Sequence, residues 1–554
     1  MKPLTYIITP LLLLLIATAC SSDQSDPTPA TDPFALENVT IGGQSNLFTF
    51  SDTDPQEPIV LLFTTRLDPR TIESNIRLKE DNQNTVPADY RYDSDRTIVI
   101  TPTKELKSYG SYSLILQPDL LSHEGQKIAS GKVITIATGL NQSDKFERID
   151  DEALLTLVQQ RTFRYFWDYG HPACGLARER TTSGDVVTTG GTGFGVMAMV
   201  VAAERGFVPR AEAAERVLKI VTFLSTRAAR FHGAFPHWLN GATGDVQPFS
   251  ADDNGADLVE TALLMEGLLT ARAYFEEAND TETTLRATIS SLWEDVEWDF
   301  FTKEGTTKQL YWHWSPDKGW KMNMPISGWN ECLIAYVLAA ASPTHPITKE
   351  VYDAGWARHG ALRNGGDFYG ITLPLGSELG GPLFFSQYSF LGLNPKGLSD
   401  GYADYWQQNR NHTLINYNYC LANPKHHAGY SAECWGLTAS DGDKGYNAWS
   451  PTNDTGVIAP TAALSAMPYT PTESMAALRF YYYKLGDKLW GDYGFIDAFN
   501  LSKGWFATGS HIAIDQGPII VMIENHRTGL PWQLFMSDRD VSRGLTVLGF
   551  TSLP

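Results

Sequence analysis

Three carboxylates stand beside apolar segments that have helical spacing. Asp253 and Asp257 are four residues apart in the stretch SADDNGADLVETALLMEGLL, where a polar loop gives way to an apolar helix. This spacing predicts that both lie on one face of the helix, at its N-terminal end. Glu331 opens a second apolar segment, shortly after Trp329 in ISGWNECLIAY. A pair of carboxyl groups, one protonated and one ionised, is what cleavage of a glycosidic bond requires.

The surroundings of each acid indicate its role. Glu331 is followed by the apolar run CLI, and desolvation by such neighbours raises the pKa of a carboxyl group, so Glu331 is the candidate general acid. Asp253 and Asp257 lie in polar sequence at a helix N-terminus, where the helix dipole favours an ionised carboxylate, so they are candidates for the base or for orienting a sugar. Glu433 and Asp454 are reserve candidates for the base. The structural alternatives are a helix cap for Asp253 and a surface acid for Glu331.

Aromatic side chains are frequent near these acids, with 15 Trp and 24 Tyr in the chain. Indole rings pack on the C–H faces of sugars, and carboxylates bind their hydroxyl groups. Core packing is the alternative for each tryptophan. Trp312 and Trp314 alternate, so one of them is expected to face a cleft and the other the core. The predicted substrate-binding residues are Trp312, Trp314, Trp329, Glu433, Trp435, Tyr446 and Asp454.

Composition and motifs argue against several other functions. The formal net charge of −20 repels phosphate backbones, so nucleic acid is not an expected partner. The glycine run at 190–195 lacks the spacing of a nucleotide-binding loop, and we expect it to form a tight loop that opens a packed helix. The pair His426-His427 has no carboxylate at ligand spacing. We therefore expect neither a metal nor a cofactor.

The N-terminal residues indicate export. An apolar run at 11–16 follows Met1-Lys2 and precedes Ala-Thr-Ala-Cys, which ends at Cys20. The run is too short to span a bilayer and is typical of a secretory signal, and the small residues before Cys20 resemble a bacterial lipobox. We expect residues 1–20 to be the lipoprotein signal with its lipid-modified cysteine, and 21–32 to be a polar tether. The protein would then be an exported lipoprotein of the periplasm or outer membrane that contacts the membrane only through its anchor; an ordinary signal peptide is the alternative.

The other cysteines do not form a metal or redox motif. They are Cys174, Cys332, Cys420 and Cys434, and no two of them have C-x-x-C spacing. A disulfide between Cys420 and Cys434 and a set of buried free thiols are both compatible with the sequence.

Residues 33–140 have the pattern of a small β domain. Short runs rich in branched residues occur at 59–63, 96–100, 112–116 and 133–136, separated by Pro, Gly, Asn and Asp. Their length and rhythm predict a seven-strand immunoglobulin-like sandwich, and the phrases LDPRTI and YGSYSLILQP resemble bacterial Ig-like modules. This segment carries no cluster of acids and aromatic residues. A polar linker at 141–150 follows it.

Residues 151–554 have helical periodicity throughout. About a dozen helices joined by long loops predict an all-α catalytic domain of the (α/α)6 toroid type, in which loops at one end build a cleft. The expected helices begin at about 150 and continue at 191–206, 209–230, 255–277, 281–301, 327–342, 347–359, 382–393, 400–422, 472–485, 515–526 and after 531.

Several blocks of this segment resemble the glucoamylase-like domain of glycoside hydrolase family 144. They are SADDNGADLVETALL (250–264), GWNECLIAY (328–336), YSAECWGLTASDG (430–442), PTAALSAMPYTPTESMAALR (460–479), GDYGFIDAFN (491–500) and IDQGPIIVMIEN (514–525). The resemblance implies an (α/α)6 barrel and an inverting hydrolase of β-1,2-glucan or its oligosaccharides. It also implies that Asp253, Asp257 and Glu331 form the acidic centre.

The resembling family contains endo-acting glucanases and an exo-acting enzyme that releases sophorose. The lipoprotein start and the added β domain are more similar to the exo-acting kind, so we expect an exo-acting, sophorose-releasing enzyme. An endo-β-1,2-glucanase, a β-1,2-glucan transglycosylase and a non-catalytic glycan-binding lipoprotein are the alternatives.

Overall fold

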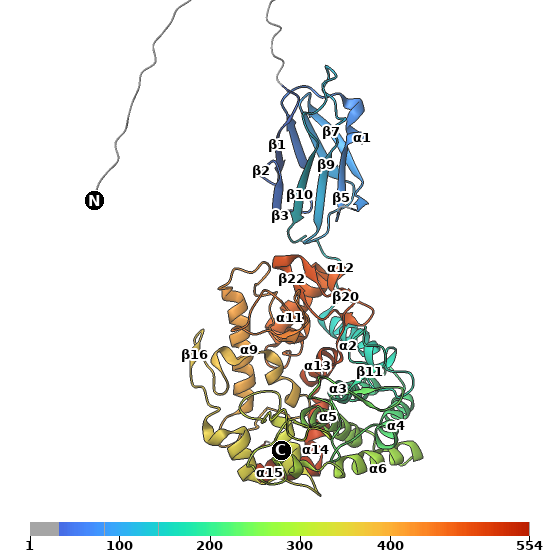
Figure 1. Ribbon diagram of the computed structural model, residues 1–554, viewed down its shortest axis with the longest axis vertical. Coiled ribbons are helices and arrows are strands. Elements are labelled where there is room, and N and C mark those ends of the chain that lie inside the picture. The colour runs from blue at the N-terminus through green and yellow to red at the C-terminus, as the bar shows by residue number, and fades with distance from the viewer. Residues whose placement is uncertain (1–32, 82, 142, 553–554) are drawn as a thin grey trace, which may run out of the picture. The chain divides into compact units, whose positions relative to one another are not determined.

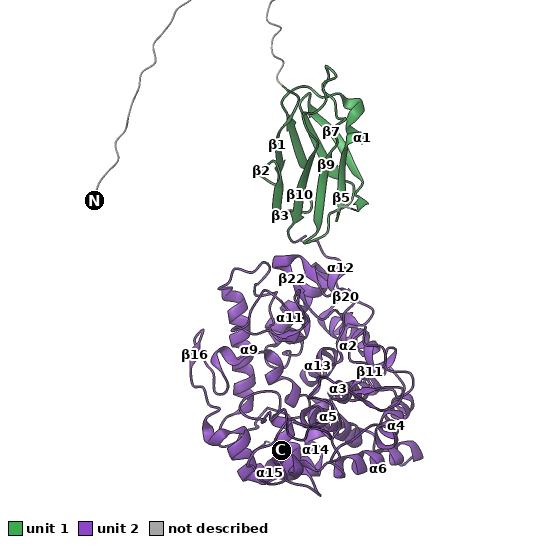
Figure 2. Cartoon of the chain, viewed as in Figure 1, with its two compact units in different colours: residues 1–139 green, residues 140–554 purple. Residues whose placement is uncertain are grey.

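The computed structural model describes residues 33–81, 83–141 and 143–552. The predicted signal segment and Cys20 lie outside the described residues. The chain divides after Gly139 into two compact units, a β unit and a helical unit (Figure 2). Within the described part of the chain, no helix is both long and apolar enough to cross a membrane.

The N-terminal unit is a sandwich of two five-stranded sheets, with strand orders β2-β1-β4-β8-β7 and β3-β10-β9-β5-β6. Its strands are β1 (Leu36–Ile41), β2 (Gln44–Asn46), β3 (Thr49–Thr53), β4 (Ile59–Phe63), β5 (Ile76–Glu80), β6 (Asn84–Thr85), β7 (Ala88–Ser94), β8 (Thr97–Pro102), β9 (Ser111–Leu116) and β10 (Lys132–Thr138); a short helix, α1 (Ile72–Asn75), precedes β5. In β4 the side chains of Ile59, Leu61 and Phe63 are buried, because alternate residues of a strand face the core.

The all-β nature of this unit and its four longest apolar runs are as predicted, but the strand number differs. The described residues of the unit form ten strands rather than seven. Strands of two or three residues, such as β2 and β6, are too short to show an alternating pattern in the sequence.

The helical unit is an (α/α)6 toroid (Figure 1). Its helices are α2 (Asp151–Trp167), α3 (Thr189–Glu204), α4 (Arg210–Thr226), α5 (Leu258–Tyr274), α6 (Asp280–Glu294), α7 (Leu333–Ala341), α8 (Lys349–Val351), α9 (Tyr405–Ala422), α10 (Pro460–Leu464), α11 (Pro471–Arg479), α12 (Gly486–Leu489), α13 (Ala513–Arg527), α14 (Leu530–Ser537) and α15 (Arg539–Leu548). Short two-stranded pairings lie in the loops between them, among them β14 (Ala256–Asp257) with β15 (His313–Trp314) and β18 (Ala439–Ser440) with β19 (Asn447–Ala448).

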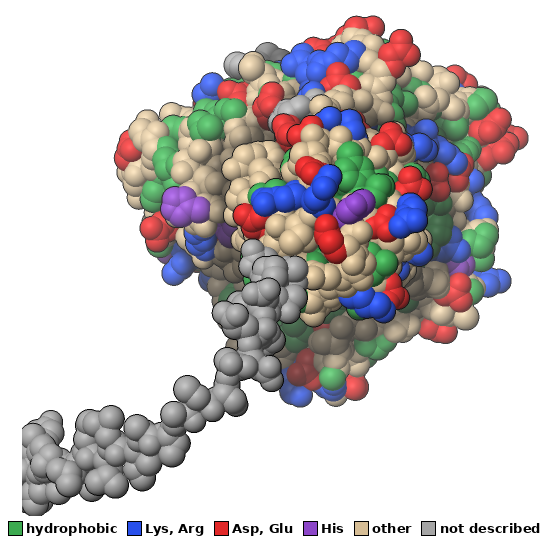
Figure 3. Space-filling model, turned by 90° about the horizontal axis from the view of Figure 1, so that it is seen from above, with side chains coloured by type: hydrophobic (Ala, Val, Ile, Leu, Met, Phe, Trp, Pro, Cys, Tyr) green, Lys and Arg blue, Asp and Glu red, His purple; other side chains and the backbone are tan. Residues whose placement is uncertain are grey.

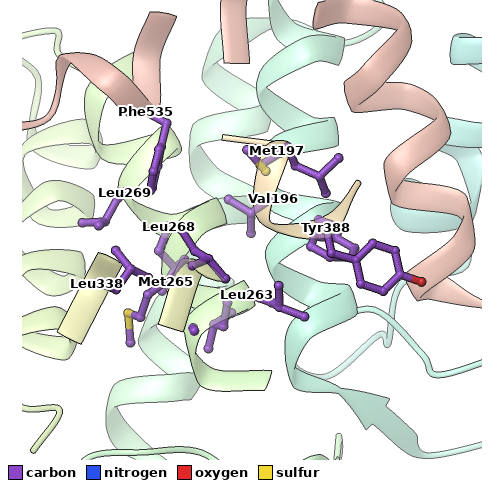
Figure 4. Close-up of a cluster of buried hydrophobic side chains, with 14 of the residues drawn as sticks. Val196, Met197, Leu263, Met265, Leu268, Leu269, Leu338, Tyr388 and Phe535 are labelled. Atoms are coloured by element: carbon purple, nitrogen blue, oxygen red, sulfur yellow. The ribbon is translucent and has the colours of Figure 1, made fainter. Parts of the chain in front are cut away.

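Helices α3, α5, α7 and α13 are almost wholly buried and form the centre of the unit. Their apolar side chains meet in one cluster, in which residues of α3, α5 and α7 lie beside Phe535 of α14 (Figure 4). A helix that is apolar on all sides is stable only when other helices surround it, so the sequence of these four helices requires their central position.

Glycines allow α3 and α5 to approach closely. A Cβ atom on Gly193 would lie 2.2 Å from the carbonyl oxygen of Leu263, and one on Gly267 would lie 2.1 Å from that of Gly193. The glycine run at 190–195 therefore lies inside α3, where it permits backbone contact with α5. The prediction that these glycines form a loop before the helix was wrong.

A further helix prediction differs from the structure, and the predicted linker at 141–150 has hydrogen bonds to the helical unit. Residues 382–393 contain two short 3₁₀ turns, Leu383–Ser386 and Tyr388–Phe390, instead of an α-helix. The segment expected to be a linker is hydrogen-bonded to the helical unit, because the N–H of Lys145 donates to the carbonyl oxygen of Tyr483 at 2.6 Å and that of Ile149 donates to its hydroxyl oxygen at 3.0 Å.

Basic and acidic side chains are interspersed on the face shown in Figure 3. This face therefore lacks the continuous basic surface with which proteins hold nucleic acids.

Candidate active site

A cavity of about 440 Å³ lies where the N-terminal ends of α3, α5, α7 and α13 converge. Thr188 and Val259 come from the starts of α3 and α5, Glu331 lies shortly before α7, and Ile512 lies just before α13. The complete lining is Glu179, Arg180, Thr188, His237, Trp238, Phe249, Val259, Glu260, Leu263, Trp312, Glu331, Phe384, Tyr388, Ala439, Tyr446, Ala448, Ile512 and Ile514. Because the N-terminal ends of helices carry partial positive charge, this position favours anionic groups.

Asp257 is the N-cap of α5 and holds two residues of the cavity wall. One carboxylate oxygen accepts the backbone N–H groups of Val259 (3.0 Å) and Glu260 (2.9 Å). The other oxygen is 3.1 Å from Nδ1 of His237 and accepts Nε1–H of Trp312, also at 3.1 Å. Asp257 itself is fully buried and does not line the cavity, so it fixes the positions of His237 and Trp312.

His237 faces the cavity as a cation held between acids. Burial lowers the pKa of this imidazole, but the charge of Glu260 and the hydrogen bond to Asp257 outweigh burial and raise the pKa to about 9. Its Nε2 atom lies 3.8 Å from a carboxylate oxygen of Glu260. At neutral pH the ring therefore carries a positive charge, which partly balances the surrounding carboxylates.

Two acidic residues of the cavity wall come from the central helices. Glu260 lies in the first turn of α5, and Glu331 lies just before α7. Glu260 accepts the backbone N–H of Gly190 at 2.7 Å, and burial raises its pKa although His237 opposes the shift. Burial also raises the pKa of Glu331, to about 7, and the charges of Glu260 and Asp257 add to this effect. The hydroxyl of Ser389 donates to the backbone carbonyl of Glu331 and holds it in place. Near neutral pH the cavity therefore contains Glu331, which retains its proton in part of the molecules, and Glu260, which lies beside the cationic His237.

Asp253 and Asp257 do not share a helical face, contrary to the prediction. Helix α5 begins at Leu258, so Asp257 caps it and Asp253 lies in the preceding loop. Asp253 is 7% exposed, does not line the cavity, and has a carboxylate oxygen 3.3 Å from Nε2 of His313. Burial and the charge of Asp257 raise its pKa to about 7.

The predicted aromatic residues divide into two groups. Trp312 and Tyr446 line the cavity. Trp314 packs outside it, edge-on against His232 at 4.9 Å, so Trp312 and Trp314 face different environments, as their alternation predicts. Trp329 is buried among core rings and lies 6.2 Å from Tyr405 between ring centres, without lining the cavity.

The other predicted binding residues lie away from the cavity lining. Trp435 is fully buried and packs at 5.3 Å against Tyr417. Glu433 is exposed in a turn. Asp454 is buried and accepts hydrogen bonds from the hydroxyl groups of Tyr419 (3.0 Å) and Tyr430 (2.7 Å), which gives it a structural environment.

A second group of charges borders the cavity and was not anticipated. Arg180, in the lining, pairs with Glu179 at 2.9 Å and with Asp441 at 2.9 Å. The backbone N–H of Asp441 donates to Asp497 at 2.6 Å. Asp497 and Asp515 are both buried, and burial is the main cause that raises the pKa of each. The charge of Asp441 adds to the shift of Asp497, whose pKa is about 7, and the charge of Asp497 raises the pKa of Asp515 further.

His237, Asp253 and Asp257 could also hold a cation, because one ligand atom from each lies within 4.8 Å of the others. Imidazole nitrogen and carboxylate oxygen are donors that several divalent metals accept. His237 and Asp257 are, however, already hydrogen-bonded to each other. The geometry is that of a positioned imidazole, and no step in the chemistry below depends on a metal.

Among the cavity residues missed in the sequence are Glu260, His237, Phe249, Glu179 and Arg180. Glu260 had a signal, since Asp257-x-x-Glu260 has the spacing of a capping box, in which the glutamate would fold back on its own helix. The structure instead turns Glu260 toward Gly190 of α3. Nothing in the local sequence distinguishes the other four from surface or core residues.

Comparison with known proteins agrees with the fold. A family model described as "Putative glucoamylase" matches residues 323–539, and one described as "Bacterial Ig-like domain" matches residues 31–138. A solved structure of a putative glucoamylase from Bacteroides uniformis is 57% identical, with a TM-score of 0.72, and the match covers 74% of this chain and 99% of that one. The endo-β-1,2-glucanase from Chitinophaga pinensis, solved with sophorotriose and glucose, is 51% identical, with a TM-score of 0.71 and coverages of 73% and 99%.

A curated relative adds a different kind of action. The exo β-1,2-glucooligosaccharide sophorohydrolase (non-reducing end) from Parabacteroides distasonis is 44% identical over 455 residues, which are 77% of this chain. The match spans 63% of that relative's length. The helical unit is thus an (α/α)6 toroid whose cavity is lined by acidic and aromatic residues, as in carbohydrate-active enzymes. The chain belongs to the glucoamylase-like family of glycoside hydrolases, family 144.

Proposed function

We propose that the protein is an inverting glycoside hydrolase that cleaves β-1,2-linked glucan or its oligosaccharides. The observation that carries the proposal is the position of Glu331, whose carboxyl group has a pKa of about 7 and lines the same cavity as Glu260 and His237. Glycoside hydrolysis needs a protonated acid at the leaving oxygen and an anion that assists the attack of water. The substrate class follows from the relatives, which act on β-1,2-linked glucans or oligosaccharides.

In this proposal Glu331 donates its proton to the glycosidic oxygen as the bond to the anomeric carbon breaks. Glu260 is the anionic partner; it accepts the proton of the attacking water, directly or through a hydroxyl group of the substrate. Asp257 has no free acceptor site, since four donors occupy its two oxygens, and it acts by orienting His237 and Trp312. Asp253, whose pKa burial and the charge of Asp257 raise to about 7, takes no proton-transfer step in this proposal.

We further propose exo action with release of sophorose, the activity that the Parabacteroides distasonis relative carries in its name. The Chitinophaga pinensis relative, an endo-acting enzyme, supports endo cleavage as the second candidate. The two actions give different products from long glucan at early times. Exo action releases sophorose while the polymer length falls slowly, whereas endo action gives a ladder of mixed sizes from the first minutes.

The test is product analysis with a panel of β-glucans that differ only in linkage. We expect sophorose from β-1,2-glucan and no product from β-1,3-, β-1,4- or β-1,6-glucan. NMR of the fresh product should show the α-anomer first, because a single displacement inverts the β-configuration. Products longer than the substrate would indicate transglycosylation, and binding without any product would contradict the proposed hydrolysis.

We also propose that Cys20 carries the lipid that attaches the protein to a membrane. The support is the lipobox-like segment that ends at this cysteine. Cys20→Ser should move the protein from the membrane fraction to the soluble fraction of the exporting cell, without changing its specific activity. Persistence of the variant in the membrane fraction would contradict lipid anchoring.

A further inference from the structure

Two large rings at the cavity stand half in solvent. Phe249 is 50% exposed and Tyr446 is 49% exposed, and both line the cavity. They come from separate loops: Phe249 lies in the loop before α5, and Tyr446 lies in the hairpin between β18 and β19. We call these two side chains the rim rings. Exposed apolar surface beside a cavity is typical of a site that a ligand covers.

The ring of Phe249 is held by two aromatic neighbours. It stacks on the imidazole of His237, with ring centres 4.4 Å apart and an interplanar angle of 25°. It also packs against Trp238 at 4.9 Å. Despite these contacts Phe249 is still 50% exposed, so part of its surface is available to a ligand in the cavity.

The loop that carries Phe249 is tied to a second loop by charges. The N–H of Phe249 donates to the carbonyl oxygen of Asp253 at 3.0 Å and closes a tight turn. Asp252 in this turn pairs with Lys318 (3.2 Å) and Lys321 (2.9 Å) of the neighbouring loop. These ion pairs fix the turn and thereby the position of the phenyl ring.

The hairpin that carries Tyr446 is also anchored. Its strands pair through Ala439 with Ala448, and Asp441 at its base binds Arg180 at 2.9 Å. Arg180 in turn belongs to the cavity lining. The loops that carry both rim rings are therefore anchored, which reduces the entropy that would be lost in ordering them around a ligand.

We propose that Phe249 and Tyr446 form a binding subsite for a glucosyl residue beyond the one at Glu331, and that this subsite sets the chain-length preference. Sugar C–H faces pack on aromatic rings, so each ring can cover one face of a glucosyl unit. The inference rests on the proposed β-1,2-glucan hydrolysis and deepens it. A substrate too short to reach the rim rings gains nothing from them, whereas a longer one gains affinity.

The experiment compares Phe249→Ala and Tyr446→Ala with the unchanged protein on purified β-1,2-glucooligosaccharides from trimer to hexamer. We expect KM to rise about tenfold for each variant on the longer substrates and to stay within about twofold on the shortest substrate that is cleaved. Phe249→Trp should restore the KM of the longer substrates. Tyr369→Ala is the matched control, since Tyr369 is 45% exposed but does not line the cavity.

Three outcomes would overturn the subsite. These are an unchanged KM at every length, an equal rise at every length, and a uniform loss of kcat with a shifted pH profile. The last would mean that Phe249 only shields His237. If instead the unchanged protein cleaves no β-1,2-glucooligosaccharide while the linkage panel is also negative, the proposed function itself is wrong, and the subsite falls with it.

Discussion

The replacement Glu331→Gln tests the central chemical claim. Glutamine keeps the size and hydrogen-bonding capacity of the side chain but has no acidic proton to give to a leaving oxygen. In the proposed mechanism, the barrier on a natural glucan should then rise because the departing hydroxyl group would leave as an alkoxide.

The expected magnitude follows from the environment of Glu331. With a pKa of about 7, roughly half of the molecules carry the proton at pH 7, against about 0.3% for a glutamate of ordinary pKa. Burial thus enlarges the reactive population about 150-fold. Loss of a general acid lowers kcat by about a hundredfold to ten-thousandfold, which corresponds to about 3 to 5 kcal/mol in the barrier.

Two substrates separate proton donation from binding. On β-1,2-glucooligosaccharide, kcat should fall at least about a hundredfold. On an aryl β-sophoroside with a dinitrophenolate leaving group, which departs without protonation, the variant should stay within about tenfold of the unchanged enzyme. The unchanged enzyme should lose activity as the pH rises through about 7, because Glu331 ionises; this alkaline limb should be missing in the variant.

The matched control is Glu433→Gln, an exposed glutamate outside the cavity lining. It should leave both rates unchanged. A folded Glu331→Gln protein that cleaves the oligosaccharide at more than a tenth of the native rate would refute the assignment. An equal loss on both substrates would also refute it, because that result shows a binding or structural role.

Three further replacements test the structure around the site. Asp257→Ala removes the cap of α5, so the free energy of unfolding measured by urea denaturation should fall by at least about 1 kcal/mol. The same change releases His237 and Trp312 and should abolish turnover. Stability equal to the native value would contradict the capping role. Glu266 is buried, and burial raises its pKa to about 8. Because the pKa of Glu266 is higher in the folded than in the unfolded protein, the contribution of its protonated form to stability is complete below about pH 4.5. This contribution, about 5 kcal/mol, is lost as the pH rises through 8. Glu266→Gln should therefore stabilise the protein at pH 9 and not at pH 4, and a gain that does not depend on pH would contradict the buried neutral acid. Trp314→Phe should change kcat/KM less than about twofold, because Trp314 packs outside the cavity; a tenfold loss would place it in the site.

Local pattern was sufficient for the longer strands and most long helices, and for one candidate catalytic acid. The run at 59–63 is β4, residue for residue, because alternate burial of five apolar residues has few other solutions. Glu331 could be identified because the apolar run after it predicted both a central helix and a desolvated carboxyl group. The same reasoning placed Asp257 on a helical face, whereas it caps the helix from one residue outside. The first residue of a helix depends on which side chain accepts hydrogen bonds from the first backbone N–H groups. The periodicity of apolar residues does not predict this.

Membership of the cavity could not be derived from local pattern. Trp435 and Tyr446 are aromatic residues eleven positions apart, yet the indole is fully buried and the phenol is half exposed. The difference arises because Trp435 precedes the β18–β19 hairpin and faces the core, while Tyr446 lies in the hairpin loop, directly before β19. Glu260 shows the same limit, since its contact with Gly190 joins residues 70 positions apart. Such contacts depend on how the helices pack against each other. In a single sequence the only sign of this packing is the set of glycines that allow two helices to approach closely.

The division of labour among the acids follows from the same packing. Converging helix N-termini bring partial positive charge to the cavity, and Asp257 and Glu260 each accept backbone N–H groups. The hydrogen bond from Gly190 opposes the rise that burial causes in the pKa of Glu260. His237 adds a full positive charge beside them. Glu331 does not contact His237 and lies in the field of the two anions, so its proton is retained to a higher pH. If this account is correct, Glu260→Gln removes one of the anions, and the alkaline limb of the residual activity should move to lower pH. A limb that stays in place would show that burial alone sets the acidity of Glu331.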